Sequence, residues 1–169
     1  LPRQRFNVLE MITTLITDRF SGLQGPKPKI QVALPFADLY GEPVSIRQAI
    51  ANLLDNAAKF SRRTPVPTIT IGGTRTDHER ILWVQDNGIG FDPAQTEKIF
   101  GLFERLHSPQ DYDGTGVGLA IVKLVMDKHE GRVWAESTPG AGSKFSLAFP
   151  ERAEIVVDRS SPFSSLPPA

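Results

Sequence analysis

The chain has 169 residues, 40% of them hydrophobic, and its 19 basic side chains balance its 19 acidic ones. A chain of this length can bury one core, so we expect one globular domain, and its neutral net charge argues against nucleic acid as a partner. The absence of cysteine excludes a disulfide scaffold and a thiolate metal site. No apolar run reaches the roughly 18 residues that a membrane span needs, so we expect no membrane contact by this fragment.

The first half of the chain predicts two helices and three strands. Apolar residues at a helical period predict a helix over residues 6–20 and a second one over residues 44–60. Residues 29–34 predict a short strand, and residues 35–43 are expected to form a loop. A pair of strands follows at residues 68–74 and 80–85.

In the second half, Asp92 and Pro93 are typical of a helix start, and the short helix that they begin is expected to end near residue 106. Residues 108–115 are polar and rich in turn-forming residues, which predicts a mobile loop. A helix over residues 119–130 and strands over residues 132–136 and 144–149 complete the pattern. Mixed strands and helices in this order predict an α/β two-layer sandwich.

One face of the predicted helix 44–60 is polar. Gln48, Asn52, Asn56 and Lys59 are spaced by four, four and three residues, so they lie opposite the apolar stripe. Most polar stripes are simply solvated. Asparagine, however, costs roughly half a kcal/mol in a helix relative to alanine, and its amide oxygen suits Mg²⁺. Lys59, one turn further on, could meet a phosphate.

Two glycine-rich segments are candidates for binding a phosphate. The segment from Asp86 to Gly90 follows a strand, and the segment from Gly114 to Leu119 precedes a helix, where backbone N–H groups can approach a phosphate closely. The spacing of the second segment differs from a dinucleotide-binding fingerprint, and residues 107–113 cannot form the buried strand that this fingerprint needs.

Asp86 permits two interpretations from its position at the end of a strand. It can be an ordinary turn aspartate that accepts a local backbone hydrogen bond. It can also be a fixed acceptor for the exocyclic amine of adenine, a choice that would disfavour guanine.

Side chains near the polar loop and the histidines have ordinary explanations as well. Phe100 and Phe103 are expected to pack in the core, and Arg105 can be a surface charge or can meet a γ-phosphoryl group. The three histidines, His78, His107 and His129, lie far apart without the spacing of metal ligands, so structural or solvated roles are expected.

Taken in order, these segments resemble the sequence boxes of sensor histidine kinases. The matches are residues 52–60 to the asparagine box, 86–90 to the first glycine box, 100–103 to the phenylalanine box, 114–119 to the second glycine box and 142–145 to the closing strand. The resemblance covers about residues 6–150. It implies the Bergerat ATP-binding fold of gyrase B, the MutL mismatch-repair ATPases and a heat-shock chaperone, in which a mixed sheet carries helices on one face and a mobile lid covers ATP.

Residues 103–107 and 133–137 resemble, less specifically, the corresponding segments of phytochrome-like sensor kinases.

The resemblance implies roles for the residues around the metal and the base. Asn56 would coordinate a Mg²⁺ ion that bridges the phosphates, with Asn52 close by. Lys59 would contact phosphate, and Phe60 would pack beside the adenine. Asp86 would accept the hydrogen bond of the adenine N6 amine.

The remaining implied roles concern the lid and its surroundings. Arg105 would reach the γ-phosphate, and the glycines of the second box would let the lid and the helix N-terminus wrap the phosphates. The further positions implied for nucleotide binding are Gly88, Gly90, Gly114, Thr115, Gly116, Val117, Gly118, Leu119 and Ser143.

Asn52 departs from the ATPase relatives, in which a glutamate at this position activates water. An amide cannot act as a general base at neutral pH, so the departure favours transfer of the γ-phosphoryl group over hydrolysis. A hydrolysing ATPase of the same fold and a non-catalytic nucleotide-sensing module remain open as alternatives.

The phosphoacceptor histidine of this family lies in a pattern like H-E-x-R-T-P, which none of the histidines of this chain has. We therefore expect a catalytic domain at residues 23–150, preceded at residues 1–22 by a linker helix from a missing dimerisation and phosphoacceptor domain. Residues 151–169 are expected to form a disordered tail or linker.

The resemblance also implies partners. The dimerisation domain of the same protein would supply the histidine, and a response regulator would act downstream. The isolated domain is expected to be monomeric and cytoplasmic and the parent protein a homodimer, with attachment of the parent to a membrane left open.

Overall fold

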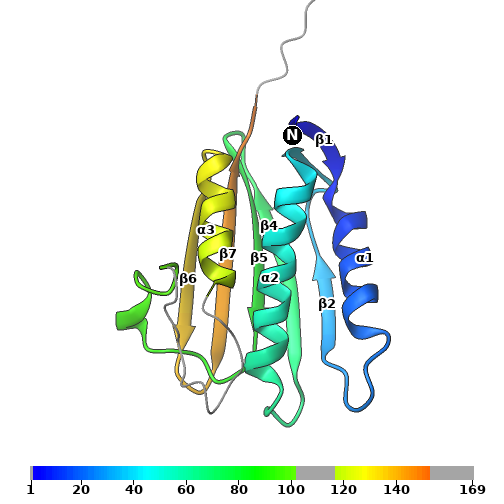
Figure 1. The fold of residues 1–169 in the computed structure, drawn as a ribbon, viewed down its shortest axis with the longest axis vertical. Coiled ribbons are helices and arrows are strands. Elements are labelled where there is room, and N and C mark those ends of the chain that lie inside the picture. Colours follow the sequence, from blue (N-terminus) through cyan, green and yellow to red (C-terminus); the bar gives the residue numbers. More distant parts are fainter. Residues whose placement is uncertain (1, 102–116, 153–169) are drawn as a thin grey trace, which may run out of the picture.

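The computed structural model describes residues 2–101 and 117–152 and shows a sheet with helices on one face (Figure 1). The helices are α1 (Val8–Phe20), α2 (Pro43–Ser61) and α3 (Gly118–Lys128). The five strands of the sheet follow the order β2 (Lys29–Ala33), β4 (Thr68–Arg75), β5 (Glu79–Asp86), β7 (Gly142–Pro150) and β6 (Arg132–Thr138). Strand β2 pairs with β4 in parallel and the other pairs are antiparallel, so the sheet is mixed. The predicted α/β two-layer sandwich is confirmed.

A second, two-stranded sheet corrects the prediction near the N-terminus. Strand β1 (Gln4–Asn7) pairs with β3 (Asp38–Gly41). The first helix therefore starts at Val8 rather than at residue 6, because the Asn7 side chain caps it by accepting the N–H of Glu10 at 2.8 Å. The expected loop over residues 35–43 contains β3. Four-residue strands give too short a pattern to be recognised without their partner.

The helix expected after Asp92 is also shorter than predicted. Asp92 does act as a cap, accepting the N–H of Ala94 at 2.9 Å, but the regular part is the 3₁₀ helix η1 (Pro93–Gln95). Irregular turns follow it as far as residue 100. The Thr96 hydroxyl donates to the carbonyl of Pro93 at 2.6 Å, a local bond of the kind that competes with a continuing helix. Residues 102–106 lie outside the described residues.

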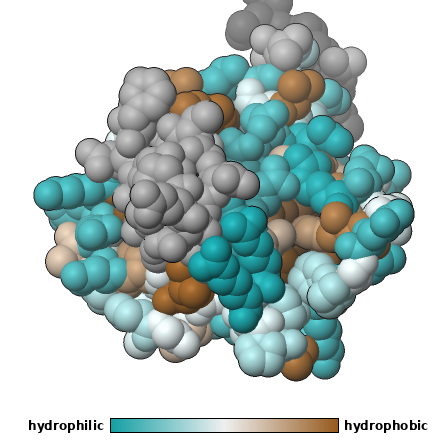
Figure 2. Space-filling view, turned by 60° about the horizontal axis from the view of Figure 1, so that its bottom comes forward, coloured by the Kyte–Doolittle hydropathy of each residue, from teal (hydrophilic) through white to brown (hydrophobic). Residues whose placement is uncertain are grey.

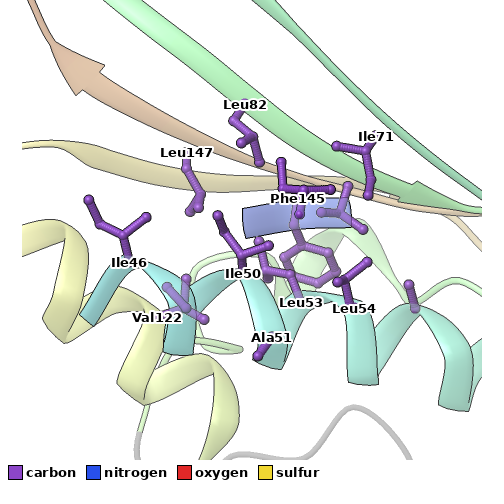
Figure 3. Close-up of a cluster of buried hydrophobic side chains, with 14 of the residues drawn as sticks. Ile46, Ile50, Ala51, Leu53, Leu54, Ile71, Leu82, Val122, Phe145 and Leu147 are labelled. Atoms are coloured by element: carbon purple, nitrogen blue, oxygen red, sulfur yellow. The ribbon is translucent and has the colours of Figure 1, made fainter. Parts of the chain in front are cut away.

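The core lies between α2 and the sheet. The apolar side of α2 points at the sheet in Figure 3, and its large side chains Ile46, Ile50, Leu53 and Leu54 are each at most 1% exposed. They meet Leu82 of β5 and Leu147 of β7, and Val122 of α3 joins the same cluster. Each such side chain contributes about 1.5–3 kcal/mol on burial. The burial of this face directs the polar face of α2 away from the sheet.

Helix α1 belongs to the same core, since Val8, Ile12 and Leu15 are fully buried in it. The assignment of residues 1–22 to a linker from another domain stays a prediction.

An ion-pair network closes the end of the sheet at which β5 begins. The buried guanidinium of Arg80 binds both carboxylate oxygens of Glu151, at 2.9 and 3.1 Å, and lies 2.9 Å from a carboxylate oxygen of Asp38. Hydrogen bonds from Arg5 and Arg80 hold the pKa of Asp38 below its usual value, against the opposing effect of burial. The network joins β3 to β5 and to the residues after β7, at the end of the sheet opposite Asp86.

Candidate functional site

Four chain segments meet at the end of the sheet where β5 ends and β7 begins. The N–H of Ile89, in the turn after β5, donates to the carbonyl of Phe60 near the end of α2 at 3.1 Å. The N–H of Gly140, in the turn before β7, donates to the carbonyl of Ile89 at 2.7 Å. The Asn52 amide of α2 donates to the carbonyl of Gly118, the first residue of α3, at 3.1 Å. These contacts bring the predicted site residues of the described segments to one end of the molecule.

This end lies at the bottom of Figure 1 and comes forward in Figure 2. Its visible surface is largely hydrophilic, with smaller apolar areas between the polar ones.

Asp86 is a buried carboxylate without a cationic partner in the described part of the chain. It is the last residue of β5, is only 5% exposed, and accepts the N–H of Gly88 at 2.8 Å and the N–H of Ser143. Burial raises the pKa of Asp86 to about 6, although these two backbone hydrogen bonds act in the opposite direction. The predicted turn role is therefore confirmed. A carboxylate that is kept buried at such a cost is also a candidate for ligand binding.

Gly88 and Gly90 are required by the packing of the turn. A Cβ atom on Gly88 would lie 2.2 Å from the carbonyl oxygen of Phe60. Gly90 has a φ of +66°, and a Cβ atom there would lie 2.3 Å from the carbonyl oxygen of Thr138. The first glycine segment therefore lets the turn after Asp86 approach α2 on one side and the β6–β7 hairpin on the other.

Ser137 holds the same turn in place, a role that the sequence did not indicate. Its hydroxyl accepts the N–H of Phe91 at 2.8 Å and donates to the carbonyl of Gly142 at 2.8 Å. Its single proton is thereby used, so the Ser143 hydroxyl, 3.0 Å away, donates to it. Ser143, predicted to bind the nucleotide, is thus fixed next to Asp86 by both its hydroxyl and its N–H.

Asn87 also proves structural. Its side chain accepts the N–H of Thr68 and donates to the carbonyl of Val66, each at 2.8 Å, so it fixes the start of β4.

The two asparagines of α2 differ in their surroundings. The Asn52 amide accepts from Gln48 at 2.8 Å and donates to Gly118, so both of its polar atoms have protein partners. The half-buried Asn56 side chain has no hydrogen-bond partner among the described residues. An unpaired amide oxygen fits a hard cation such as Mg²⁺, which uses few protein ligands and retains waters or phosphate oxygens.

Lys59 and Phe60 end the polar face of α2. The Lys59 Nζ lies 4.8 Å from the centroid of the Phe60 ring, a cation–π distance, and both residues are half-buried. Lys59 thus places a positive charge one turn beyond Asn56.

The start of α3 offers backbone donors. Its N-cap, Val117, makes no capping hydrogen bond with its side chain, and the first N–H bonded back into the helix is that of Ile121. The N–H groups before that of Ile121 have no partner among the described residues, and such groups, together with the helix dipole, favour an anion at a helix terminus. Leu119, in contrast, is 8% exposed and packs in the core, which gives its side chain a structural role.

The remaining predicted residues, Arg105, Gly114, Thr115, Gly116 and Phe103, lie outside the described residues, as do the expected lid loop and most of the expected tail.

Two histidines fit the structural or solvated roles expected of them. His78 is exposed and His129 is buried, whereas His107 lies outside the described residues. Within residues 2–101 and 117–152, no three His, Asp or Glu side chains are grouped closely enough to hold a metal ion. None of the helices described there combines the length and apolarity needed to cross a bilayer.

Comparison with known proteins finds a family profile and individual proteins that match this chain. The sequence profile described as histidine kinase-, DNA gyrase B- and HSP90-like ATPase matches residues 41–153. The phytochrome-like protein Cph1 of Synechocystis is 43% identical over 109 residues, which cover 64% of this chain and 14% of Cph1. The methanogenesis regulatory histidine kinase FilI of Methanothrix harundinacea is 35% identical over 141 residues, 83% of this chain and 16% of FilI.

Solved structures show the same fold. The mycobacterial sensor histidine kinase MprB is similar with a TM-score of 0.73 and 25% identity, over 88% of this chain and 97% of that structure. Full-length ShkA, solved in complex with AMPPNP, gives a TM-score of 0.72 at 22% identity over 88% of this chain and 31% of that one. The chain spans only 14–16% of the length of the first curated relatives.

The raised pKa of Asp86 predicts a distinctive pH dependence of stability. Because its pKa rises from an ordinary 3.8 to about 6 on folding, the folded protein holds the proton more tightly than the unfolded chain. This stabilisation is complete below about pH 4 and is lost as the pH rises through about 6. Between pH 4 and 8, the free energy of unfolding of the wild type should fall relative to Asp86→Asn by up to about 3 kcal/mol.

Urea denaturation of both proteins without nucleotide measures this difference, since all other titrating groups are shared. Parallel pH profiles would show that Asp86 titrates in the folded protein as it does in the unfolded chain.

Proposed function

The chain belongs to the family of histidine kinase-, DNA gyrase B- and HSP90-like ATPases, and from this premise we propose that it binds Mg²⁺-ATP and transfers the γ-phosphoryl group to a histidine on a separate domain. The predicted resemblance to the catalytic domain of sensor histidine kinases is confirmed. The observation that carries the proposal is the presence of two polar groups at one end of the sheet. Asp86 is a buried carboxylate with no cationic partner among residues 2–101 and 117–152, and the Asn56 amide has no hydrogen-bond partner among the same residues.

Asp86 recognises the adenine base in this proposal. One of its oxygens already accepts the N–H of Gly88, and a carboxylate has further lone pairs for the N6 amine of adenine. With a pKa of about 6 the group is mostly ionised at pH 7, so it can accept there. The backbone hydrogen bonds of Gly88 and Ser143 hold the carboxylate at the sheet end before any ligand arrives.

Asn56, Lys59 and the start of α3 hold the phosphates. The Asn56 amide oxygen would hold a Mg²⁺ ion, which would supply neutralisation of charge on the phosphate oxygens. Lys59 adds a second positive charge, and the N-terminal amides of α3 add a partial one. Phosphoryl transfer depends mainly on such positioning and charge neutralisation. In the same proposal, Arg105 contacts the γ-phosphate, and the second glycine segment forms part of the lid over the phosphates.

The surroundings of Asn52 support transfer rather than hydrolysis. The side chain is an amide whose two polar atoms already bind Gln48 and Gly118, so it cannot remove a proton from water. Its role in this account is to fix α2 against the start of α3.

The acceptor lies outside this chain in the proposal. Relatives such as FilI and MprB carry the name histidine kinase, and this chain corresponds to a small part of the curated ones. We propose a dimerisation domain of the parent protein as the phosphoryl acceptor, in a homodimer that acts in the cytoplasm with a response regulator downstream.

Calorimetry tests the binding half of the proposal. The wild type should bind adenosine, and should bind ATP more tightly with Mg²⁺ than without it. Asp86→Asn should weaken both ligands about tenfold or more, because a buried charged acceptor is lost. Asn56→Ala should leave adenosine binding unchanged and remove most of the effect of Mg²⁺.

Lowering the pH below about 6 should weaken adenosine binding to the wild type, because Asp86 then becomes protonated.

Lys123→Ala is a matched control, since Lys123 pairs only with Asp127 within α3 in the described residues. If the wild type bound neither ligand, the proposal would fail.

Phosphotransfer is tested with the phosphoacceptor domain of the parent protein supplied in trans. With γ-labelled ATP, the wild type should label that domain on histidine, giving an acid-labile phosphoramidate, and Asn56→Ala should label it at least about tenfold more slowly. Steady release of free phosphate without labelling would identify a hydrolysing ATPase. Tight ATP binding with neither outcome would identify a nucleotide-sensing module.

A further inference from the structure

Helices α2 and α3 lie side by side in opposite directions, and polar contacts tie them at both ends of their overlap (Figure 1). One tie is the hydrogen bond from Asn52 to the carbonyl of Gly118, where α3 begins. The other is the ion pair between Lys128 Nζ and Glu42 Oε2, 2.5 Å apart, where α3 ends. The two ties are separated by the same number of residues in both helices, about 15 Å of helix.

His129 forms a third contact at the far end of this overlap. Its Nδ1 lies 2.8 Å from the carbonyl oxygen of Val125, so Nδ1 carries the proton. Its Nε2 is then an acceptor, and it receives the backbone N–H of Glu42 at 2.9 Å. The ring is 5% exposed and packs edge-on against Phe149, with centroids 6.5 Å apart. Both nitrogens of this histidine are therefore used to join the end of α3 to the start of α2.

The Glu42 carboxylate completes the contact from the side of α2. It is almost fully buried and accepts hydrogen bonds from Lys128 and Ser45, which lower the pKa of Glu42 to about 2. A buried carboxylate of this kind needs its cation, because the loss of one partner leaves a charge without compensation.

The N-terminal segment reaches the same place. The Arg3 guanidinium donates to the carbonyl of Lys128 at 2.5 Å, and Gln4 pairs with Gly41, the residue before Glu42. Gly41 also lies against the ring of His129, since a Cβ atom there would be 2.9 Å from the ring Cδ2. The end of α3 is thus held by α2, by β3 and by the chain before β1.

We infer that His129, with Lys128 and Glu42, is a positioning residue that sets where the N-terminus of α3 lies relative to Asn56. Helix α2 continues past Asn52 to Ser61, so Asn56 and Lys59 lie on the part of α2 beyond the start of α3. A shift of α3 along α2 changes the distance between its N-terminal amides and these side chains. The inference rests on the proposed function, because it concerns how the protein binds the phosphates of the nucleotide.

The adenine side of the site should not respond to such a shift. Asp86, Gly88 and Ser143 are held by the end of β5, the start of β7 and the end of α2. His129 contacts β7 at Phe149, near the opposite end of that strand. The inference therefore predicts that the affinity for Mg²⁺-ATP falls while the affinity for adenosine stays the same. Damage to the whole fold would weaken adenosine and ATP alike.

The test compares His129→Gln and Lys128→Ala with the control Lys123→Ala, which removes an exposed lysine of the same helix. Binding of adenosine and of Mg²⁺-ATP is measured by calorimetry, and folding by circular dichroism. Both variants of the contact should weaken Mg²⁺-ATP about three- to tenfold, the size expected for a lost hydrogen bond, and change adenosine binding less than twofold. The control should change neither.

The half-exposed Lys128 keeps the test valid if His129→Gln does not fold. An unchanged ratio of ATP to adenosine affinity in folded Lys128→Ala overturns the inference while leaving the proposed function standing. A wild type that binds neither ligand overturns both.

Discussion

The packing of α2 against the sheet is the constraint on which the rest of the structure depends. Ile50, Leu53 and Leu54 are buried against β4, β5 and β7, and this burial fixes the rotation of the helix about its axis. The polar side chains of the same helix must then lie on the other side. One apolar stripe therefore determines both the core and the direction in which Asn52, Asn56 and Lys59 point.

Several residues of the candidate site lower the free energy of unfolding of the protein. The buried Asp86 carboxylate has no cationic partner in the part of the chain that the structure describes, and two asparagines occupy positions in α2 where better helix formers exist. The large apolar core can tolerate these costs, each of which is on the order of a kcal/mol. Groups held in this way are ready to bind a ligand, because the protein has already paid for their desolvation and orientation.

Sequence patterns predicted the features that depend on local periodicity. The amphipathic period of α2 predicted its polar face, and the position of Asp86 with its glycines predicted a turn at the end of a strand. The resemblance to sensor histidine kinases, rather than these patterns alone, assigned the residues to one nucleotide site, which stays a prediction. The α/β sandwich followed from the alternation of helices and strands.

The features that the sequence did not predict depend on contacts between distant residues. Strands β1 and β3 are short, and each is defined by pairing with the other. The contact of His129 with Glu42 joins residues 87 positions apart, so neither residue shows it alone. Ser137 likewise has no distinguishing neighbour in the sequence, and its role follows from the packing of the β6–β7 hairpin against the turn after Asp86.

The central claim is that the end of the sheet at Asp86 binds the nucleotide, with the base on the side of β5 and β7 and the phosphates between α2 and α3. Nuclear magnetic resonance of the ¹⁵N-labelled protein tests it most directly. Adenosine should shift the amide signals of Gly88, Ile89 and Ser143, and Mg²⁺-ATP should add shifts at Asn56, Lys59 and Gly118. Shifts concentrated instead at the opposite end of the sheet, around Arg80 and Glu151, would contradict the account.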